Sequence, residues 1–201
     1  MNKVITISRE YGAGGHSIGT KVAEALGIPF YDRDIVRATV EESGFEKKLI
    51  EKEEEDRSTG DDIWKKISSI SSSYFNDSQD AIHEIQKAII IKMAQKGPCV
   101  ILGRCADVIL TNNRIPHISI FITAPFEQRV RRMMEVNNLP LKEAVRRLKK
   151  IDKGHEQYYH FYTGRKWGDA VNYDLCINSA CYGIEESVEL IERMIDIHPE
   201  K

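Results

Sequence analysis

The sequence predicts an α/β fold with three layers, in which helices cover both faces of a five-stranded parallel sheet. Five short apolar runs are spread along the 201 residues, and amphipathic helical patterns separate them. The first run leads into a cluster of glycines and then directly into a helical pattern. Because ligands of parallel α/β sheets lie at the carboxyl ends of the strands, we expect the functional residues at that edge.

The expected strands are short apolar runs bounded by polar or turn residues, at 4–8, 28–31, 99–102, 118–123 and 173–178. The expected helices carry apolar residues at helical spacing. Gly27 ends the first helix and Asp32 can cap the second, while Pro125 and Pro140 each begin a helix, since proline suits the first turn. The helical segments are 16–26, 32–43, 63–74, 78–96, 125–137, 140–151 and 184–195.

The composition is that of a globular protein with no general affinity for polyanions. With 41% hydrophobic residues the chain can build a core, and its net charge of −2 gives no attraction to nucleic acid or to an anionic membrane. No apolar run approaches the ~20 residues that a membrane-spanning helix needs, and we expect no signal peptide. The four cysteines form no C-x-x-C pair, so we expect buried, reduced thiols and a cytoplasmic protein.

The glycine-rich segment after the first strand is the strongest candidate for a phosphate site. Glycines allow a tight turn and a close approach of backbone N–H groups to an anion, and the helix that follows adds unpaired N–H donors. The candidate residues are Gly12, Ala13, Gly14, Gly15, His16 and Ser17. The alternative is a plain strand-to-helix turn.

This segment departs from the phosphate-binding P-loop pattern G-x-x-x-x-G-K-[ST], because no register supplies the lysine. If Gly15 is the last glycine, His16 takes the lysine position and Glu10 the position of the first glycine. If Gly14 is the last glycine, Gly15 takes the lysine position and Arg9 that of the first glycine. Both registers remain open at this point.

Three further side chains are candidates for chemistry on a bound phosphate. Ser17, or His16 in the other register, takes the position of the hydroxyl that contacts magnesium, and Ser17 is the better candidate because magnesium prefers oxygen ligands. The alternative for Ser17 is an ordinary hydroxyl at a helix start. Arg129 and Arg132 share a helix face in a segment, 125–150, that holds eight basic and three acidic residues. One arginine side chain can donate hydrogen bonds to two oxygens of a phosphate. We therefore expect both arginines, with His16, to act in catalysis. The alternative is that the arginines are plain surface residues.

Several segments together resemble the cytidylate kinase-like family of P-loop nucleoside monophosphate kinases. The resemblance covers about residues 3–38 and 97–192. The segments that carry it are ITISREYG at 5–12, the glycines 14–15, GIPFYD at 27–32, ILGR at 101–104, FITAP at 121–125 and NYDLCIN at 172–178.

The resemblance implies one P-loop kinase-like domain over residues 1–201, with strand order 2-3-1-4-5. It implies a helical acceptor-binding region at about 32–96 and a lid at about 125–168, in which arginines close over the reacting phosphates. We expect these lid arginines to be exposed, so that their removal barely changes stability. By the same resemblance, the acceptor is held by Asp32, Arg37, Arg104 and Asp107, with Asp107 paired to Arg104.

The activity implied is phosphoryl transfer from ATP, with Mg²⁺, to a nucleoside monophosphate such as CMP or dCMP. The missing lysine keeps two alternatives open: a nucleotide-binding regulator with little catalysis, and a P-loop kinase of another small metabolite. The expected partners are small-molecule nucleotides, with neither a nucleic acid polymer nor a membrane, and the oligomeric state is left open. We expect His155 at the surface and the aromatic residues 158–162 as packing.

Overall fold

The computed structural model describes residues 3–32 and 75–197. The chain divides into two compact units, residues 1–32 with 90–201 and residues 33–89. The first unit contains the whole sheet, and helix α5 (Phe75–Lys96) begins in the second unit and ends in the first.

Some expectations fall outside the described residues. These are Arg37 and the helices expected at 32–43 and 63–74. The assignment of one domain with an acceptor-binding region at 32–96 stays a prediction.

The sheet has five strands in the order β2-β3-β1-β4-β5, and every neighbouring pair is parallel. This confirms the predicted fold class and strand order. The strands are β1 (Val4–Arg9), β2 (Phe30–Tyr31), β3 (Cys99–Leu102), β4 (His117–Thr123) and β5 (Leu175–Asn178).

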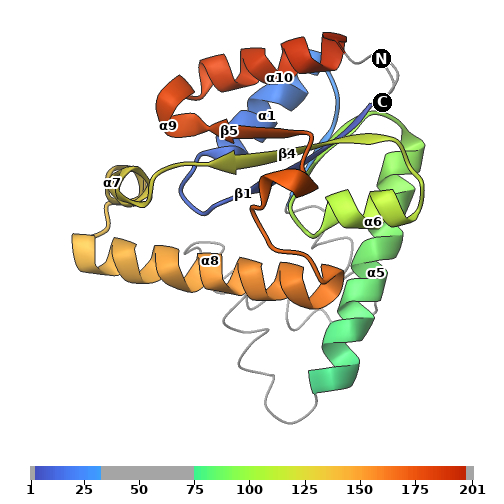
Figure 1. The fold of residues 1–201 in the computed structure, drawn as a ribbon, viewed down its shortest axis with the longest axis horizontal. Coiled ribbons are helices and arrows are strands. Elements are labelled where there is room, and N and C mark those ends of the chain that lie inside the picture. The colour runs from blue at the N-terminus through green and yellow to red at the C-terminus, as the bar shows by residue number, and fades with distance from the viewer. Residues whose placement is uncertain (1–2, 33–74, 198–201) are drawn as a thin grey trace, which may run out of the picture. The chain divides into compact units, whose positions relative to one another are not determined.

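Helices form a layer on each side of this sheet (Figure 1). One layer holds α1 and α10, and the other holds α6 and α8, while α7 follows the end of β4. The helices are α1 (Gly15–Leu26), α5 (Phe75–Lys96), α6 (Ala106–Asn112), α7 (Phe126–Asn137), α8 (Leu141–Thr163), α9 (Ser179–Tyr182) and α10 (Glu185–Ile197), with a 3-10 turn at Ala170–Asn172.

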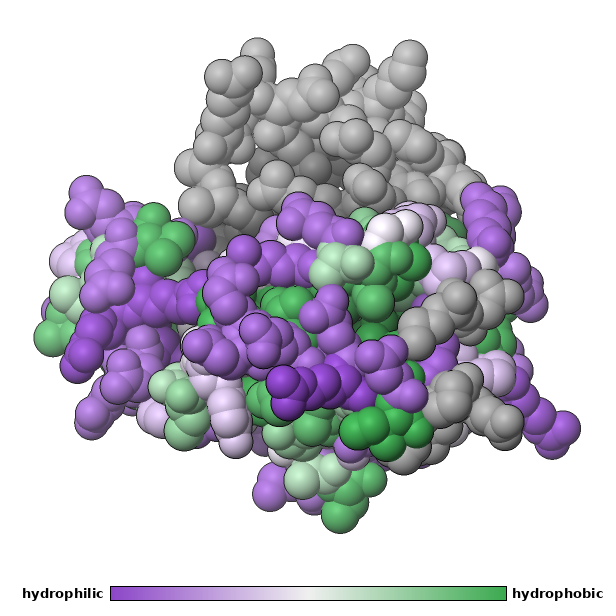
Figure 2. Space-filling view, turned by 90° about the horizontal axis from the view of Figure 1, so that it is seen from above, coloured by the Kyte–Doolittle hydropathy of each residue, from purple (hydrophilic) through white to green (hydrophobic). Residues whose placement is uncertain are grey.

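The main core lies between the sheet and the layer of α1 and α10. Its strands are apolar because both faces of the central strands are covered. It contains isoleucines with no exposed surface, including Ile5, Ile7, Ile18, Ile120 and Ile191. The outer side of α10 is polar, and the face of the molecule that carries this helix is largely hydrophilic (Figure 2). The burial of one face of each helix therefore holds the carboxyl edge of the sheet in place.

The elements differ from the expected ones in three places. The structure has α6 directly after the turn that follows β3, and no helix was expected there. Helix α8 continues to Thr163, because the aromatic residues after Gly154 pack as helical residues, with Tyr159 almost fully buried. Residues 179–182, to which no expected helix was assigned, form the short α9, which the Asn178 side chain caps.

The expectation of buried thiols is only partly met. Cys99 and Cys105 are buried free thiols, as expected, but Cys176 and Cys181 are exposed, since they lie on the edge strand β5 and on α9. None of the described helices is both long enough and apolar enough to cross a membrane.

Candidate functional site

The glycine segment forms a tight loop between β1 and α1 at the carboxyl edge of the sheet. Gly12 and Gly14 have φ values of 81° and 82°, a left-handed conformation that favours glycine. Gly14 is the N-cap of α1, and Gly15 is the first helical residue. The loop therefore ends at Gly14, and Gly15 occupies the position where a P-loop has its lysine.

A network of ionic side chains holds the start of this loop, and we call it the loop clamp: Glu10, Arg129 and Asp152. The Tyr11 N–H donates to Asp152 (2.9 Å), and Arg129 donates to the Tyr11 carbonyl (3.1 Å) and to Asp152. Glu10 accepts from Arg129 (3.4 Å) and from the Ala124 N–H (3.1 Å). Burial raises the pKa of Asp152, although its hydrogen bonds to Arg129 and Tyr11 favour the charged form.

The prediction that Arg129 is an exposed lid residue is wrong. Its side chain is only 6% exposed, and it also donates through Nε to the Ala124 carbonyl at 3.0 Å. Helix α7 turns this face toward the loop because its apolar neighbours pack against Tyr11 and Leu148. Arg129 therefore positions the loop, with its N–H groups directed at carboxylates and carbonyls.

Two further contacts fix the second half of the loop. The Ser179 hydroxyl, at the start of α9, donates to the Ala13 carbonyl at 2.6 Å. A Cβ at Gly12 would lie 3.2 Å from side-chain carbons of Arg129 and Leu148, so the loop packs tightly against α7 and α8. The loop is thus preformed, which lowers the entropic cost of binding a ligand.

Arg132 lies directly over the glycine loop. A Cβ at Gly14 would be 2.9 Å from a terminal nitrogen of the Arg132 guanidinium and 2.8 Å from the Ile184 side chain. The structure thus separates the two arginines that the sequence grouped together. Arg129 belongs to the loop clamp and contacts the start of the loop at Tyr11. The Arg132 guanidinium lies beside Gly14, the residue that caps α1.

His16 and Ser17 occupy the first turn of α1. The His16 side chain is 64% exposed, its Nε2 lies 3.8 Å from an Asp32 carboxylate oxygen, and its ring packs edge-on against Phe30. Ser17 is partly buried, three residues after the Gly14 cap. No cluster of three metal-ligating side chains occurs among the described residues. In the register that ends at Gly14, His16 takes the Ser/Thr position of the P-loop and Ser17 is the next residue, so Ser17 as the magnesium ligand stays a prediction.

The turn after β3 has an unusual backbone. Gly103, Arg104 and Cys105 are three consecutive left-handed residues, with φ values of 74°, 62° and 55°. A left-handed conformation costs a non-glycine residue roughly 1–2 kcal/mol, and such strain is concentrated at functional sites. The turn leads from β3 into α6 and places Arg104 at the carboxyl edge of the sheet.

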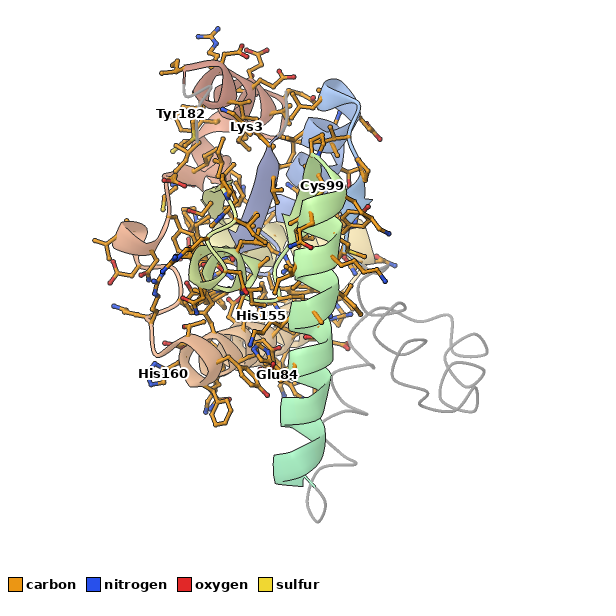
Figure 3. The ribbon with its side chains drawn as sticks, turned by 90° about the vertical axis from the view of Figure 1, so that its right-hand side faces the viewer. Lys3, Glu84, Cys99, His155, His160 and Tyr182 are labelled. Carbon is orange, nitrogen blue, oxygen red and sulfur yellow. The ribbon has the colours of Figure 1, made fainter. Side chains whose placement is uncertain are left out.

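Arg104 and Arg9 are two neighbouring cations near Asp32, and the neutral His155 lies beside them. Burial lowers the pKa of Arg104, while Tyr158 and Asp32 oppose this effect. Burial, with Arg9 and Arg104, lowers the pKa of His155 to about 3. The prediction of a surface histidine holds only in part, since His155 is half-buried and its Nδ1 is buried without a hydrogen-bond partner. His155 lies on the inner side of α8, whereas His160 points away from the molecule (Figure 3).

Asp107 does not occupy the place that the sequence predicted. It is 3% exposed on α6, where it accepts a hydrogen bond from the Tyr159 hydroxyl at 2.7 Å, and burial raises its pKa. Asp107 therefore belongs to the packing of α6 against α8, and its expected pairing with Arg104 is replaced by Tyr159.

Sequence reasoning missed several contacts that shape the site. Asp152 and Ser179 contact the loop from 141 and 166 residues away. Glu10 stood inside the loop segment, but nothing in its pattern indicated that it joins Arg129. No local signal could have found these contacts, because they depend on how α7, α8 and α9 return to the edge of the sheet.

Replacing Arg129 by Ala should destabilise the protein strongly. The change leaves the Asp152 carboxylate buried without its cation, which typically costs about 3–5 kcal/mol. Urea unfolding monitored by circular dichroism measures this change. Arg131→Ala, an exposed neighbour on α7, is the control and should stay within about 0.5 kcal/mol of the parent. Equal stability of both variants would contradict the clamp.

His155, with its buried Nδ1, should make the protein sensitive to mild acid. Its folded pKa of about 3 lies below the unfolded value near 6.5, so the unfolded state binds more protons as the pH falls through 6.5. The parent should therefore lose about 2 kcal/mol between pH 6.5 and pH 5 that His155→Gln does not lose. Urea titrations at several pH values measure this, with the exposed His160→Gln as the control. Parallel curves for parent and His155→Gln would refute the assignment.

Comparison with known proteins agrees with this geometry. The model of the cytidylate kinase-like family matches residues 4–180. The chain is 28% identical over 125 residues to a cytidylate kinase of Methanococcus aeolicus, which covers 62% of this chain and 70% of that protein. It is 27% identical over 113 residues to a cytidylate kinase of Desulfurococcus amylolyticus, which covers 56% of this chain and 60% of that protein.

Solved structures share the fold. A crystal structure of an uncharacterized protein from Eubacterium ventriosum matches with a TM-score of 0.70 and 30% identity, over 96% of this chain and 98% of that chain. A shikimate kinase from Bacteroides thetaiotaomicron matches with a TM-score of 0.55 and 15% identity, over 98% of this chain and 99% of that one. The latter likeness concerns the fold alone, whereas the family match spans the sheet, the glycine loop and the clamp. The chain belongs to the cytidylate kinase-like family and has the fold of P-loop kinases.

Proposed function

We propose that this protein transfers the γ-phosphoryl group of ATP to a nucleoside monophosphate, with CMP or dCMP as the acceptor. The observation that carries the proposal is the preformed glycine loop, residues 12–17, with the Arg132 guanidinium over its cap residue Gly14. Family membership supports a kinase acting on a nucleotide or another small metabolite. The names of the curated relatives support cytidylate as the acceptor.

The donor nucleotide would bind at the loop through backbone groups. The first turn of α1 offers N–H groups without helical partners, and the helix dipole adds positive potential at the same place. Ser17 is the residue that would hold Mg²⁺ together with the phosphate oxygens. The bound ion supplies neutralisation of negative charge on the phosphates.

Phosphoryl transfer needs little covalent help from the protein, so positioned cations do most of the work. Arg132 over Gly14 would meet the phosphates of the donor at the mouth of the loop. His16 lies on the β2 side of this mouth, near Asp32. The proposal thus keeps Arg132 as the catalytic arginine and gives Arg129 the role of positioning the loop.

The acceptor would lie at the neighbouring strand ends, β2 and β3. Asp32 follows β2 and Arg104 follows β3, and the two interact electrostatically. Arg104 would bind the acceptor phosphate, and Asp32 would accept hydrogen bonds from its nucleoside. This arrangement puts donor and acceptor side by side at the carboxyl edge of one sheet, as an in-line transfer requires.

The test is a screen of all nucleoside monophosphates with ATP and Mg²⁺, read as ADP released. We expect CMP or dCMP to give the highest kcat/KM. Turnover with another hydroxyl compound only would support a small-metabolite kinase. Tight ATP binding without turnover of any acceptor would support a nucleotide-binding regulator.

Replacing Gly14 by Val should abolish ATP binding at the loop. The residue is left-handed, and a side chain there would displace Ile184 and Arg132. We expect ATP affinity, measured by calorimetry, to fall more than about tenfold, or more than 1.4 kcal/mol. Gly154→Val, at an open position on α8, is the control and should bind ATP as the parent does. A folded Gly14→Val protein with unchanged affinity would place the ATP site elsewhere.

Replacing Arg132 by Ala should lower kcat and kcat/KM together, the pattern of an interaction made mainly in the transition state. Loss of one preorganised donor typically costs about 10²–10³-fold in kcat. Arg132→Lys should recover only part of this, because an ammonium cannot pair with two oxygens. Arg131→Ala, one residue away and exposed, is the matched control. Unchanged turnover of Arg132→Ala on the best acceptor would remove Arg132 from the site.

A further inference from the structure

The loop departs from the P-loop pattern G-x-x-x-x-G-K-[ST] at three positions, Arg9, Gly15 and, at the Ser/Thr position, His16. The structure brings Arg9 and Gly15 into contact. Because α1 begins at Gly15, the register G-x-x-x-x-G-K runs from residue 9 to residue 15. Arg9 stands at the position of the first glycine, and Gly15 at the position of the lysine. A cation and a glycine have thus exchanged places along the chain.

The Arg9 side chain fills the space that a side chain at Gly15 would need. A Cβ at Gly15 would lie 2.6 Å from Cβ and 2.7 Å from Cγ of Arg9. Gly15 does not have a left-handed backbone, so its conformation is open to any residue. The stem of Arg9 is therefore what requires a glycine at this position.

The far end of Arg9 reaches the turn after β3. Its terminal nitrogen lies 2.6 Å from the position that a Cβ of Gly103 would take. The side chain thus extends from the first residue of α1 to the residue before Arg104. This path lies between the donor loop and the proposed acceptor turn, where a transferred phosphoryl group must pass.

The surroundings of Arg9 suit a bound anion. Burial lowers its pKa, Asp32 opposes this, and Arg104 adds to it. No carboxylate among the described residues lies within ion-pair distance of its guanidinium. Arginine stays charged under these conditions, so the site holds a half-buried cation that a phosphate would stabilise.

We propose that Arg9 replaces the missing loop lysine, and that Arg9 and Gly15 form a reciprocal exchange within the P-loop pattern. Arg9 supplies from the end of β1 the positive charge that a lysine would supply from α1, and Gly15 and Gly103 leave room for its stem and its tip. The inference rests on the proposed function, since it names the cation that faces the transferred phosphoryl group.

Arg9→Met separates charge from packing, because methionine keeps an unbranched stem of similar shape. We expect turnover on the best acceptor to fall about 10²–10³-fold, with an unfolding midpoint close to the parent's. Arg9→Lys should recover part of the loss. A role in packing alone would leave Arg9→Met within about threefold of the parent's turnover, and that result would overturn the inference.

The exchange itself can be reversed. Arg9→Gly should lose turnover as Arg9→Met does, and Gly15→Lys alone should also lose it, because the lysine meets the Arg9 stem. The double variant Arg9→Gly/Gly15→Lys removes that stem and restores a cation, so we expect turnover at least about tenfold above Arg9→Gly. Arg9→Gly/Gly154→Lys adds the same charge at an open position of α8 and should give no recovery. A folded double variant no faster than Arg9→Gly would overturn the inference.

Binding measurements distinguish failure of this inference from failure of the proposed function. If the parent neither binds ATP–Mg²⁺ nor turns over any acceptor, the proposed function fails. If the parent binds ATP–Mg²⁺, Arg9→Met should weaken ATP binding and leave AMP binding unchanged, because AMP lacks the phosphates that Arg9 would meet. If Arg9→Met binds both nucleotides and turns over the acceptor as the parent does, the role of Arg9 is overturned and the proposed function still stands.

Discussion

The backbone of Tyr11 is held from both sides, and this constraint fixes the shape of the glycine loop. Arg129 from α7 donates to its carbonyl, Asp152 from α8 accepts from its N–H, and the two side chains pair with each other. A buried ion pair adds little stability by itself. Here its value is positional, because the loop lies beyond the last pairing of β1 and β4. The placement of Arg132 over Gly14 depends on this arrangement.

The fold could be predicted from the sequence because its signals are local. Parallel strands covered on both faces are continuous apolar runs, and Gly27, Pro125 and Gly97 mark helix ends where the structure has them. The signals failed where local preference was weak. The helix after β3 begins at two left-handed residues, Arg104 and Cys105, which no propensity favours. The strand order came from the resemblance, since pairing between distant strands is not a local property.

The sequence predicted many residues of the candidate site, but it did not predict which of them contact one another. The glycine loop, Asp32 and Arg104 lie at the expected edge of the sheet. The spacing of Arg129 and Arg132 correctly indicated one helix, but spacing alone cannot show which side chain meets a carboxylate 23 residues away. The register of the loop stayed open for the same reason. The contact between the Arg9 side chain and Gly15 shows that these two departures from the P-loop pattern are related in space.

The clamp also has a thermodynamic consequence for the protein as a whole. Helices α7 and α8 each hold one backbone group of Tyr11, so the hairpin that they form cannot swing away without loosening the loop. A ligand that binds only the ordered loop must therefore favour the docked hairpin, and a docked hairpin must favour the ligand by the same free energy. Binding of a nucleotide should then lower the fraction of molecules in which these two helices are locally unfolded. A nucleotide bound at the loop would therefore slow the hydrogen exchange of backbone amides along α7 and α8, including amides far from any phosphate.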